Sequence, residues 1–317
     1  MTLRQECHHQ WRAARQISAC CVSRGCFALR CAALCCAALL GPVLLGERLF
    51  CVASLHAADT ADHELVRFES TRLSDTFFSE GAAVGDLNGD GRPDLISGPF
   101  WYEGPAFSTK RELYAPKPFD PHGYSDCFFQ FVHDIDADGD SDVVVYGFPG
   151  QQGWWLENPG HEAVSTTGHW PRHLALEVID NESPRWADIT GDGSPEIVCS
   201  VGGFFGYAEI PTENPKGRWT FTRISPEVGV QKFTHGLGVG DVDGDGRVDI
   251  LEKSGWWNQP ASLEGTPLWE RHPNAFAGPR GAKMYVRDVE RDGLNDVITS
   301  LAAHGWGLAW YRQVQAD

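Results

Sequence analysis

The sequence predicts an all-β protein built from five similar units, each supplying about four short strands. Three observations predict it. An acidic stretch containing glycine recurs five times, at intervals of roughly fifty residues. An apolar pair follows each copy, and aromatic segments follow the pair. These runs are short, rich in β-branched and aromatic residues, and divided by Gly, Pro and Asn, as strands joined by tight turns are.

The strands of each unit are predicted in a fixed order. The first strand contains an apolar residue two positions before the acidic stretch, which is Val84, Val132, Trp186, Val239 or Val286. The second strand contains the apolar pair, which is Leu95-Ile96, Val143-Val144, Ile197-Val198, Ile250-Leu251 or Val297-Ile298. The third strand is aromatic, as in "FWYEGP", "WWLENPG", "FFGYAEIP", "WWNQP" and "LAWYRQ". The fourth is basic and aromatic, as in "KRELY", "HWPRHLAL", "RWTFTRI" and "LWERH".

Four antiparallel strands in roughly fifty residues match the size of a propeller blade. The sequence therefore predicts a β-propeller of about five four-stranded blades. The last unit ends at its third strand, whereas residues 64–70 resemble the fourth-strand type and have no unit before them. We expect residues 64–70 to complete the last blade, because closing the ring removes open strand edges. The alternative is that the five units are part of a larger, incomplete propeller.

The acidic stretches, between the first and second strands, have the residue types and spacing of calcium loops. Oxygen-bearing side chains stand at positions one, three, five and nine, with a Gly at position six that permits a sharp bend. Ca²⁺ takes six to eight oxygen ligands, which suits this spacing. The predicted ligands are Asp86, Asn88, Asp90 and Asp94; Asp134, Asp136, Asp138 and Asp142; Asp188, Asp192 and Glu196; Asp241, Asp243, Asp245 and Asp249; and Asp288, Glu290, Asp292 and Asp296.

Two other structures share features of the acidic stretches. An EF-hand begins in the same way, but its flanks are helices, and the flanks here are predicted strands. An acidic turn closed by hydrogen bonds alone is the other alternative. The third loop favours such a hydrogen-bonded turn more than the other loops do, because Thr190 replaces a carboxylate at position three.

The N-terminal segment has the pattern of an export signal. Basic residues precede the apolar run "CAALCCAALLGPVLLG", and the small residues of "LHAAD" follow it. We predict an export segment over residues 1–58, cleaved after Ala57 or Ala58, and the propeller over residues 59–317. The protein is then secreted, periplasmic or at the cell surface, and it meets a membrane only if the segment stays uncleaved as an anchor. Cys127 and Cys199 are the cysteines that remain, and we expect two separately buried thiols.

The charge excludes one class of partner. The formal net charge is −17, whereas nucleic-acid binding needs a basic surface. The sequence also shows no P-loop, no Gly-x-Ser-x-Gly motif, no zinc-ligand spacing and no dinucleotide-binding fingerprint.

Candidate catalytic residues lie at the end of the strands opposite the acidic loops. Glu182 and His235 stand six residues before the leading Asp of their units, and His304 lies between the second and third strands of the fifth unit. The three side chains are expected at one mouth of the propeller, where carboxylate and imidazole groups could grip a sugar or abstract a proton. The alternative is that polar residues collect at any solvated mouth.

With these motifs, the chain resembles the FG-GAP/VCBS repeat proteins, a family that includes the propellers of integrin α-subunits and many bacterial secreted proteins. The resemblance covers residues 64–312 and implies calcium loops between the first two strands of each blade. The Phe-Gly and Gly-Ala-Pro signatures are absent, which favours the bacterial secreted branch. "HGLGVGDVDGDGRVDILEKSGWW" and "DVITSLAAHGWGLAWY" also resemble the propeller part of aldos-2-ulose dehydratase-type proteins.

Two hypotheses for function follow. The first is a secreted calcium-binding module for carbohydrate or for an extracellular protein. The second is an enzyme, a sugar lyase or dehydratase that uses Glu182, His235 and His304. A charge-dense pocket joining these three residues favours the enzyme, and a mouth plugged by Phe128 and Phe129 favours the module.

Overall fold

The computed structural model divides the chain into two compact units, Met1–Arg67 and Phe68–Asp317. The structure describes residues 67–278 and 281–314, and the fold is that of the second unit. The predicted export segment, its cleavage site and the domain boundary at residue 59 lie outside the described residues. No helix among the described residues is both long enough and apolar enough to cross a membrane.

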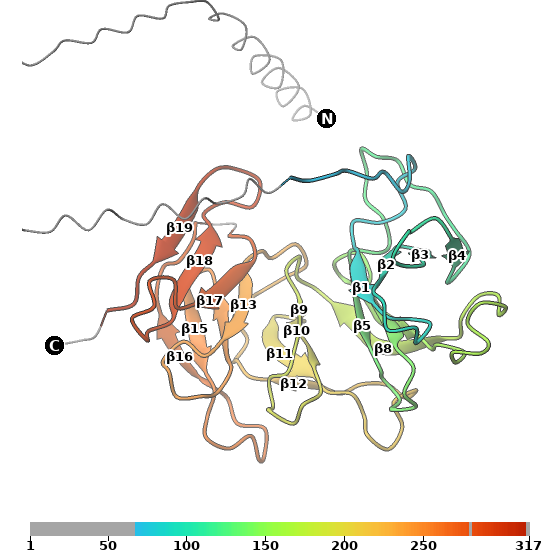
Figure 1. Cartoon of the computed structure of the whole chain (residues 1–317). Helices are drawn as coiled ribbons and strands as arrows, with labels where there is room; N and C mark the ends of the chain where they lie inside the picture. Colours follow the sequence, from blue (N-terminus) through green and yellow to red (C-terminus); the bar gives the residue numbers. More distant parts are fainter. Residues whose placement is uncertain (1–66, 279–280, 315–317) are drawn as a thin grey trace, which may run out of the picture. The chain divides into compact units, whose positions relative to one another are not determined.

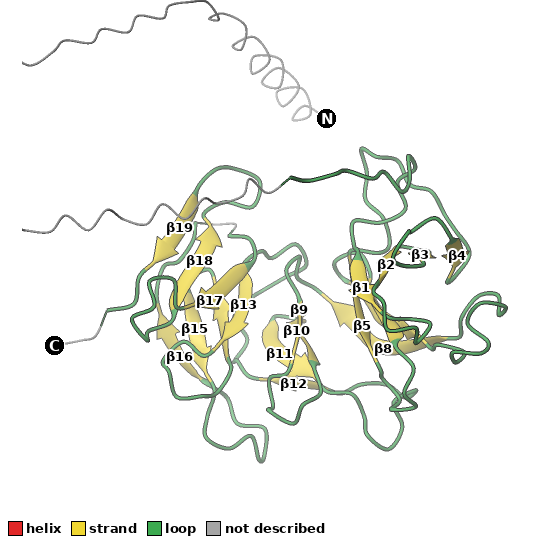
Figure 2. Ribbon diagram, in the orientation of Figure 1, coloured by secondary structure: helices red, strands yellow, loops and turns green. Residues whose placement is uncertain are grey.

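The second unit is all-β, and its described strands form five antiparallel sheets in chain order (Figures 1 and 2). The first sheet contains β1 (Ala83–Gly85), β2 (Asp94–Ser97), β3 (Phe100–Tyr102) and β4 (Lys110–Glu112). The second contains β5 (Phe129–His133), β6 (Asp142–Tyr146), β7 (Gln151–Leu156) and β8 (Arg172–Ile179). The third contains β9 (Arg185–Ala187), β10 (Glu196–Val201), β11 (Phe204–Ala208) and β12 (Phe221–Arg223).

The fourth sheet contains β13 (Leu237–Gly240), β14 (Asp249–Glu252), β15 (Gly255–Asn258) and β16 (Glu270–Pro273). The fifth contains β17 (Met284–Arg287), β18 (Asp296–Ser300) and β19 (Leu308–Tyr311). In every sheet, each strand pairs with the next along the chain. The predicted blades and the predicted order of their strands are therefore confirmed.

The register of the first two strands is the same in all five sheets. The residue before the leading Asp pairs with the residue at position nine of the acidic stretch, as Gly85 does with Asp94 and Gly240 with Asp249. The other three pairs are His133 with Asp142, Ala187 with Glu196, and Arg287 with Asp296. Position nine therefore begins the second strand of every blade, which fixes the acidic stretch as the connection between the first two strands.

Each core cluster lies between two successive sheets. Ile96 and Trp101 of the first sheet pack with Val143 and Val145 of the second. The same arrangement joins the second sheet to the third, the third to the fourth and the fourth to the fifth. The paired tryptophans take part in this packing, since Trp155 and Trp257 are almost fully buried. The sheets are therefore held together as blades are, by burial of apolar area between their faces.

We predicted that residues 64–70 complete the last blade, and for the described residues 67–70 this prediction is wrong. Residues 67–70 form no strand, and the Phe68 side chain is 93% exposed. The fifth sheet has three strands among the described residues, and none of their core clusters joins it to the first sheet. The face of the fifth sheet turned away from the fourth exposes Tyr285, Leu308 and Trp310. Residues 64–70 resemble the fourth-strand type in sequence, but β-propensity depends strongly on tertiary context and does not by itself decide pairing.

The two cysteines of this unit agree with expectation. Cys127 and Cys199 are free thiols, and both are fully buried. Each belongs to a different core cluster, where it packs as a small apolar side chain.

Candidate functional site

The acidic stretches form the connections between the first and second strands, called loops one to five here in chain order. In loop one, the leading Asp86 accepts hydrogen bonds from the backbone N–H groups of Asp90 (3.2 Å) and Gly91 (2.8 Å). The leading residues Asp134, Asp241 and Asp288 accept equivalent bonds within their own loops. Asp188 accepts bonds from Gly191 N and Gly193 N. These bonds curl each loop around its leading carboxylate, which draws the acidic side chains together.

The carboxylate at position nine connects loops one, two, four and five to the rest of their blades, whereas Glu196 of loop three accepts bonds from Ile189 and Thr190 of its own loop. Asp94 accepts hydrogen bonds from Leu87 N (3.0 Å) at the start of the loop and from Gly104 N (2.8 Å) beyond the third strand. Asp142, Asp249 and Asp296 make the same two connections in their blades. Burial raises the pKa of Asp142, Glu196 and Asp249 to about 7. A bound divalent cation would oppose this shift, because opposite charge favours the ionised carboxyl.

Loops two, three and four have a donor set that fits a calcium ion. Each brings together oxygens of three acidic side chains within 4.8 Å of one another, and these are Asp134, Asp136 and Asp142; Asp188, Asp192 and Glu196; and Asp241, Asp243 and Asp249. In loop two, one oxygen of Asp136 is buried and accepts no hydrogen bond in the protein. A buried carboxylate oxygen without a donor is costly unless a cation meets it. These residues would hold the ion, which would add electrostatic cross-links between neighbouring strands.

Loops one and five differ from the other three. In loop one, Asn88 takes the third position and accepts a hydrogen bond from Asp90 N (3.1 Å). In loop five, Arg312 pairs with Glu290 and lies 3.6 Å from Asp292. A guanidinium therefore supplies positive charge to two of the predicted ligands in loop five. An ion could take both of them only if Arg312 moved away.

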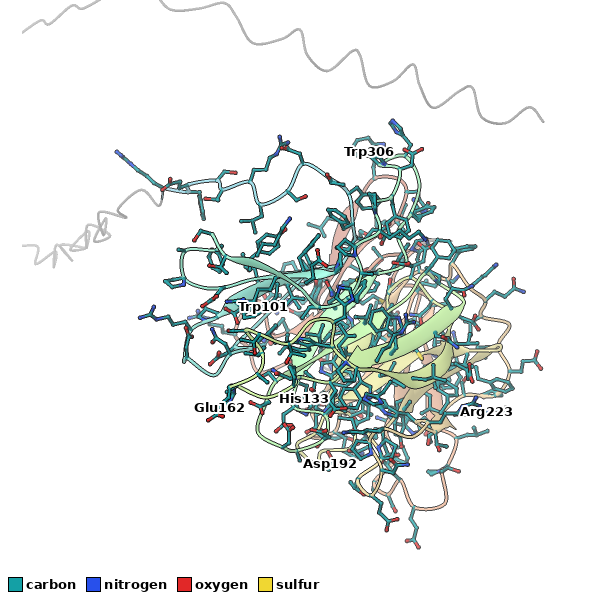
Figure 3. All side chains as sticks on the ribbon, turned by 90° about the vertical axis from the view of Figure 1, so that its right-hand side faces the viewer. Trp101, His133, Glu162, Asp192, Arg223 and Trp306 are labelled. Atoms are coloured by element: carbon teal, nitrogen blue, oxygen red, sulfur yellow. The ribbon has the colours of Figure 1, made fainter. Side chains whose placement is uncertain are left out.

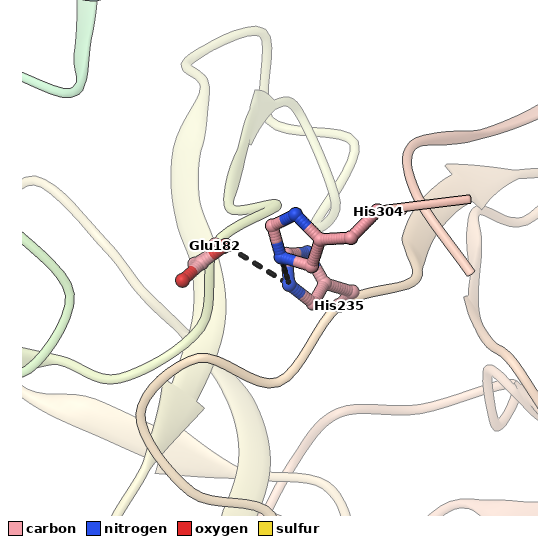
Figure 4. Close-up of side chains that lie close together, drawn as sticks. All are labelled: Glu182, His235 and His304. Atoms are coloured by element: carbon pink, nitrogen blue, oxygen red, sulfur yellow. Dashed lines mark hydrogen bonds and ion pairs between the residues drawn. The ribbon is translucent and has the colours of Figure 1, made fainter. Parts of the chain in front are cut away.

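The three candidate catalytic residues meet at the opposite end of the sheets, which is called the mouth here. Glu182 precedes β9, His235 precedes β13, and His304 lies between β18 and β19. His235 Nε2 lies 3.0 Å from Glu182 Oε2 and 3.2 Å from His304 Nε2 (Figure 4). The side chain of His235 is 9% exposed, and His304 is exposed to solvent. These three residues are called the mouth triad below.

Backbone pairing holds two members of the mouth triad in place. Glu182 N donates to Thr234 O (3.0 Å), and Phe233 N donates to Asp180 O (3.0 Å). The segments that lead into β9 and β13 therefore run together before the strands begin. Figure 3 shows Trp306, two residues after His304, and Asp192 of loop three at opposite ends of the described unit. The mouth and the calcium-type loops are thus separate sites.

Near the mouth, side chains of the second, third and fifth sheets contact one another. Arg185 of β9 donates to the carbonyl of Met284 in β17, and Tyr146 OH of β6 donates to Arg185 O (3.1 Å). Lys283 lies over the Phe129 ring, with Nζ 4.8 Å from the ring centre. Burial lowers the pKa of Lys283, and the charge of Arg185 lowers it further. Cationic and aromatic groups of the second, third and fifth sheets thus meet here, and Arg185 stands three residues after Glu182 of the mouth triad.

Four aromatic side chains form a second feature of the mouth, called the aromatic cluster here. Tyr124, Phe128, Phe148 and Phe233 follow one another with ring centres 5.3–5.8 Å apart. Tyr124 is 62% exposed and Phe233 is 42% exposed. Phe233 has a φ of 67°, a conformation that bulky residues rarely adopt. Phe233 stands two residues before His235, so one connecting segment supplies both the aromatic cluster and the mouth triad.

A groove between the first two sheets continues from the aromatic cluster. Phe148 lines it together with Phe119, Trp154, Asp126 and Arg172. Arg172 lies over the Trp154 ring, with its guanidinium carbon 3.9 Å from the ring centre. Lys117 and Asp126 face each other at 3.8 Å. The groove therefore combines aromatic faces with charged groups of both signs.

Comparison with known proteins identifies one of the repeats. Residues 134–199, from the leading Asp of loop two to Cys199 in β10, match the model of the FG-GAP-like repeat. The chain contains an FG-GAP-like repeat. The matched segment includes loops two and three and all of the strands between them. Among curated proteins, none matches the sequence.

Two solved structures resemble the chain at low identity. One is an Agrocybe aegerita lectin described as recognising non-reducing terminal N-acetylglucosamine, with a TM-score of 0.43, 20% identity, and coverage of 68% of this chain and 60% of the lectin. The other is the V. cholerae biofilm matrix protein Bap1, with a TM-score of 0.32, 17% identity, and coverage of 58% of this chain and 30% of Bap1. This chain thus spans 60% of the length of the lectin and less of Bap1.

Several residues near these sites could not be predicted from the repeat pattern of the sequence. The contact of Arg312 with loop five joins residues that the loop pattern does not connect. The aromatic cluster draws Tyr124 and Phe233 from connections without a repeated pattern. One signal was present in the sequence. Asn158 and Gln259 each follow a Trp pair and stand directly before a Pro, and both donate to carbonyls of the preceding sheet's loop.

Proposed function

We propose that this protein is a secreted, calcium-binding β-propeller that acts as a carbohydrate-binding module. The FG-GAP-like repeat and the blade architecture support a binding module. The grouped carboxylates of loops two to four support calcium as a structural ion. The basic and apolar N-terminal sequence supports export. An extracellular protein is the alternative partner class.

One observation carries the choice of carbohydrate. The exposed aromatic cluster continues at one end into a groove that carries charged groups, and at its other end Phe233 stands two residues before His235 of the mouth triad. A sugar ring presents an apolar face and a rim of hydroxyls, so it suits an aromatic platform flanked by hydrogen-bonding groups. The strained φ of Phe233 supports a functional role for its ring, since such strain collects at binding sites.

The experiment is a binding measurement on the full chain with Ca²⁺ present. A panel of immobilised neutral and acidic oligosaccharides identifies a ligand, and calorimetry then compares the wild type with Tyr124→Ala. We expect about tenfold weaker binding for this variant, because it removes an exposed stacking ring. Leu268→Ala is the matched control, since Leu268 is 59% exposed and precedes β16, away from the cluster. Equal affinities for Tyr124→Ala and the control would place the ligand elsewhere.

A second candidate function is a sugar lyase or dehydratase at the mouth. The meeting of Glu182, His235 and His304 favours it, because a carboxylate hydrogen-bonded to an imidazole is a common general-base arrangement. Product formation from ketose and uronate substrates would be followed in the wild type, His235→Ala and His304→Ala. We expect loss of at least about 100-fold in turnover for each variant. Undiminished turnover in both would remove the mouth triad from the chemistry.

A further inference from the structure

An unpaired arginine lines the groove between the first two sheets. Arg172 is the first residue of β8, and it is among the residues that line this groove. Among the residues that the structure describes, none forms an ion pair with the Arg172 guanidinium or accepts a hydrogen bond from it. Arg172 is exposed, so an incoming ligand can reach these N–H donors. A guanidinium with free donors is suited to a carboxylate, which it can bind through two parallel hydrogen bonds.

Stacking on a tryptophan holds this guanidinium in place. The guanidinium carbon of Arg172 lies 3.9 Å from the centre of the Trp154 ring. Trp154 is 5% exposed and belongs to the core cluster between the first two sheets, where the Tyr114 ring meets it edge-on with ring centres 5.3 Å apart. The core therefore fixes the surface on which the guanidinium rests. A donor group that is already in place loses less freedom when a ligand binds, which favours affinity.

The charged side chains of the groove leave one positive charge unbalanced. Within the described part of the chain, the charged residues that line it are Lys117, Asp126 and Arg172. Lys117 Nζ lies 3.8 Å from Asp126 Oδ2, so these two charges offset each other. The remaining charge is that of Arg172, in a chain whose formal net charge is −17. A ligand group with a single negative charge, such as a carboxylate, would balance it.

The rest of the groove suits a sugar ring. Its volume is about 330 Å³, near the lower end of the range for small-molecule sites. Phe119 and Phe148 line it beside Trp154, and Gln151 adds an amide. Aromatic rings pack against the apolar face of a sugar, and an amide can hydrogen-bond to its hydroxyls. A uronate residue combines such a ring with a carboxylate, whereas the carboxylate of an acidic peptide lies on a flexible chain without an apolar face.

We propose that this groove binds uronate residues of an acidic oligosaccharide, with the Arg172 guanidinium holding the uronate carboxylate. Arg172 is then the residue that selects acidic sugars over neutral ones. The aromatic cluster, which shares Phe148 with the groove, contacts neutral and acidic sugars alike. This inference rests on the proposed carbohydrate-binding function and narrows its ligand to one chemical class.

The test compares two ligands that differ only in their acidic groups. Calorimetry on the full chain measures binding of tetragalacturonate and of the matching galactose tetrasaccharide, with the same Ca²⁺ concentration in both solutions because uronates bind Ca²⁺ themselves. We expect the wild type to bind tetragalacturonate about tenfold or more tightly, since a hydrogen-bonded charge pair contributes that much. Arg172→Gln should remove this preference and leave the affinity for the galactose tetrasaccharide unchanged. Arg172→Lys, which keeps the charge without the planar fork, should restore only part of the preference.

Arg223→Gln is the matched control. Arg223 lies over the Phe204 ring with its guanidinium carbon 4.0 Å from the ring centre, but it is not among the residues that line the groove. This variant should keep the preference for tetragalacturonate. Melting temperatures equal to that of the wild type show that each variant is folded.

The possible results separate this inference from the proposed function. Equal binding of the two sugars, or a preference that survives Arg172→Gln, overturns the inference while the carbohydrate function stands. Absence of tetragalacturonate binding also overturns it, and the carbohydrate function falls with it only if no sugar of the panel binds. Polyglutamate bound as tightly as tetragalacturonate would assign the groove to acidic peptides instead.

Discussion

At the scale of single residues, side-chain amides join neighbouring blades beside the acidic loops. Asn158 Nδ2 donates to Leu87 O of loop one (2.8 Å), and Gln259 Nε2 donates to Ile189 O of loop three (2.7 Å). Both amides are buried, so the carbonyls they serve have no access to solvent water from that side. Asn295 makes a similar bond to Asp241 O, between the fifth and fourth blades. Polar contacts thus supplement apolar packing at the loop end of the sheets.

Removing one of these amides should destabilise the protein measurably. Gln259→Ala leaves the carbonyls of Ile189 and Val248 without their donor, which should lower the free energy of unfolding by about 1–3 kcal/mol. Urea denaturation with Ca²⁺ present measures the change. Gln152→Ala removes an exposed amide that bonds to Glu177, so its effect should stay within about 0.5 kcal/mol. If the two variants have the same free energy of unfolding, the hydrogen bond between the blades makes no net contribution to stability.

At the scale of elements, the repeat pattern was enough to predict the first four blades and the first three strands of the fifth. The leading Asp and the position-nine carboxylate recur with one spacing, and the structure gives them one register in all five sheets. Ile135, Ile189 and Val242, which follow leading Asp residues, are buried by the next blade. Val289 has the same place in loop five but is 45% exposed, because no described sheet covers that side. The repeat pattern therefore predicted each loop and its strands, whereas the presence of a neighbouring sheet determines whether the residue after the leading Asp is buried.

Contacts between distant segments could be predicted only where the topology of a blade determines them. That topology predicted Glu182, His235 and His304 at one mouth, and in the structure they lie within hydrogen-bonding distance. Their catalytic role stays a prediction. The pairing of Arg312 with loop five and the exposed position of Phe68 were not visible in any repeat, because each depends on where the end of a unit lies in space.

At the scale of the whole molecule, charge and blade packing act together. The formal net charge is −17, and many of the acidic side chains are gathered in five loops at one end of the sheets. Like charges held this close repel one another and oppose the compact state. In loop five, Arg312 offsets the repulsion from within the chain. In loop four Arg247 pairs with Asp245, and in loop two Lys216 Nζ lies 3.5 Å from Asp136. Loops two, three and four each still group three carboxylates, and an ion bound there would stabilise the strands that they join.

Removal of Ca²⁺ should therefore lower the melting temperature of the full chain. An ion that binds only the folded state at a hundredfold excess over its Kd stabilises it by about 2.7 kcal/mol. For a domain of this size, that corresponds to a fall of about 5–10 °C for each site emptied. Differential scanning calorimetry before and after chelation measures it, and added Ca²⁺ should restore the original value. Mg²⁺ should restore less, because it prefers smaller octahedral sites.

Two loop variants show whether the effect comes from the predicted ligands. Asp241→Asn, in loop four, should melt lower than the wild type in Ca²⁺ and lose less on chelation, because one site is already impaired. Asp292→Asn, in loop five, should change the chelation effect little, since Arg312 already pairs with that loop. An unchanged melting temperature after chelation would mean that the curled loops are closed by their backbone hydrogen bonds alone. The acidic repeats would then be hydrogen-bonded turns and not calcium-binding loops.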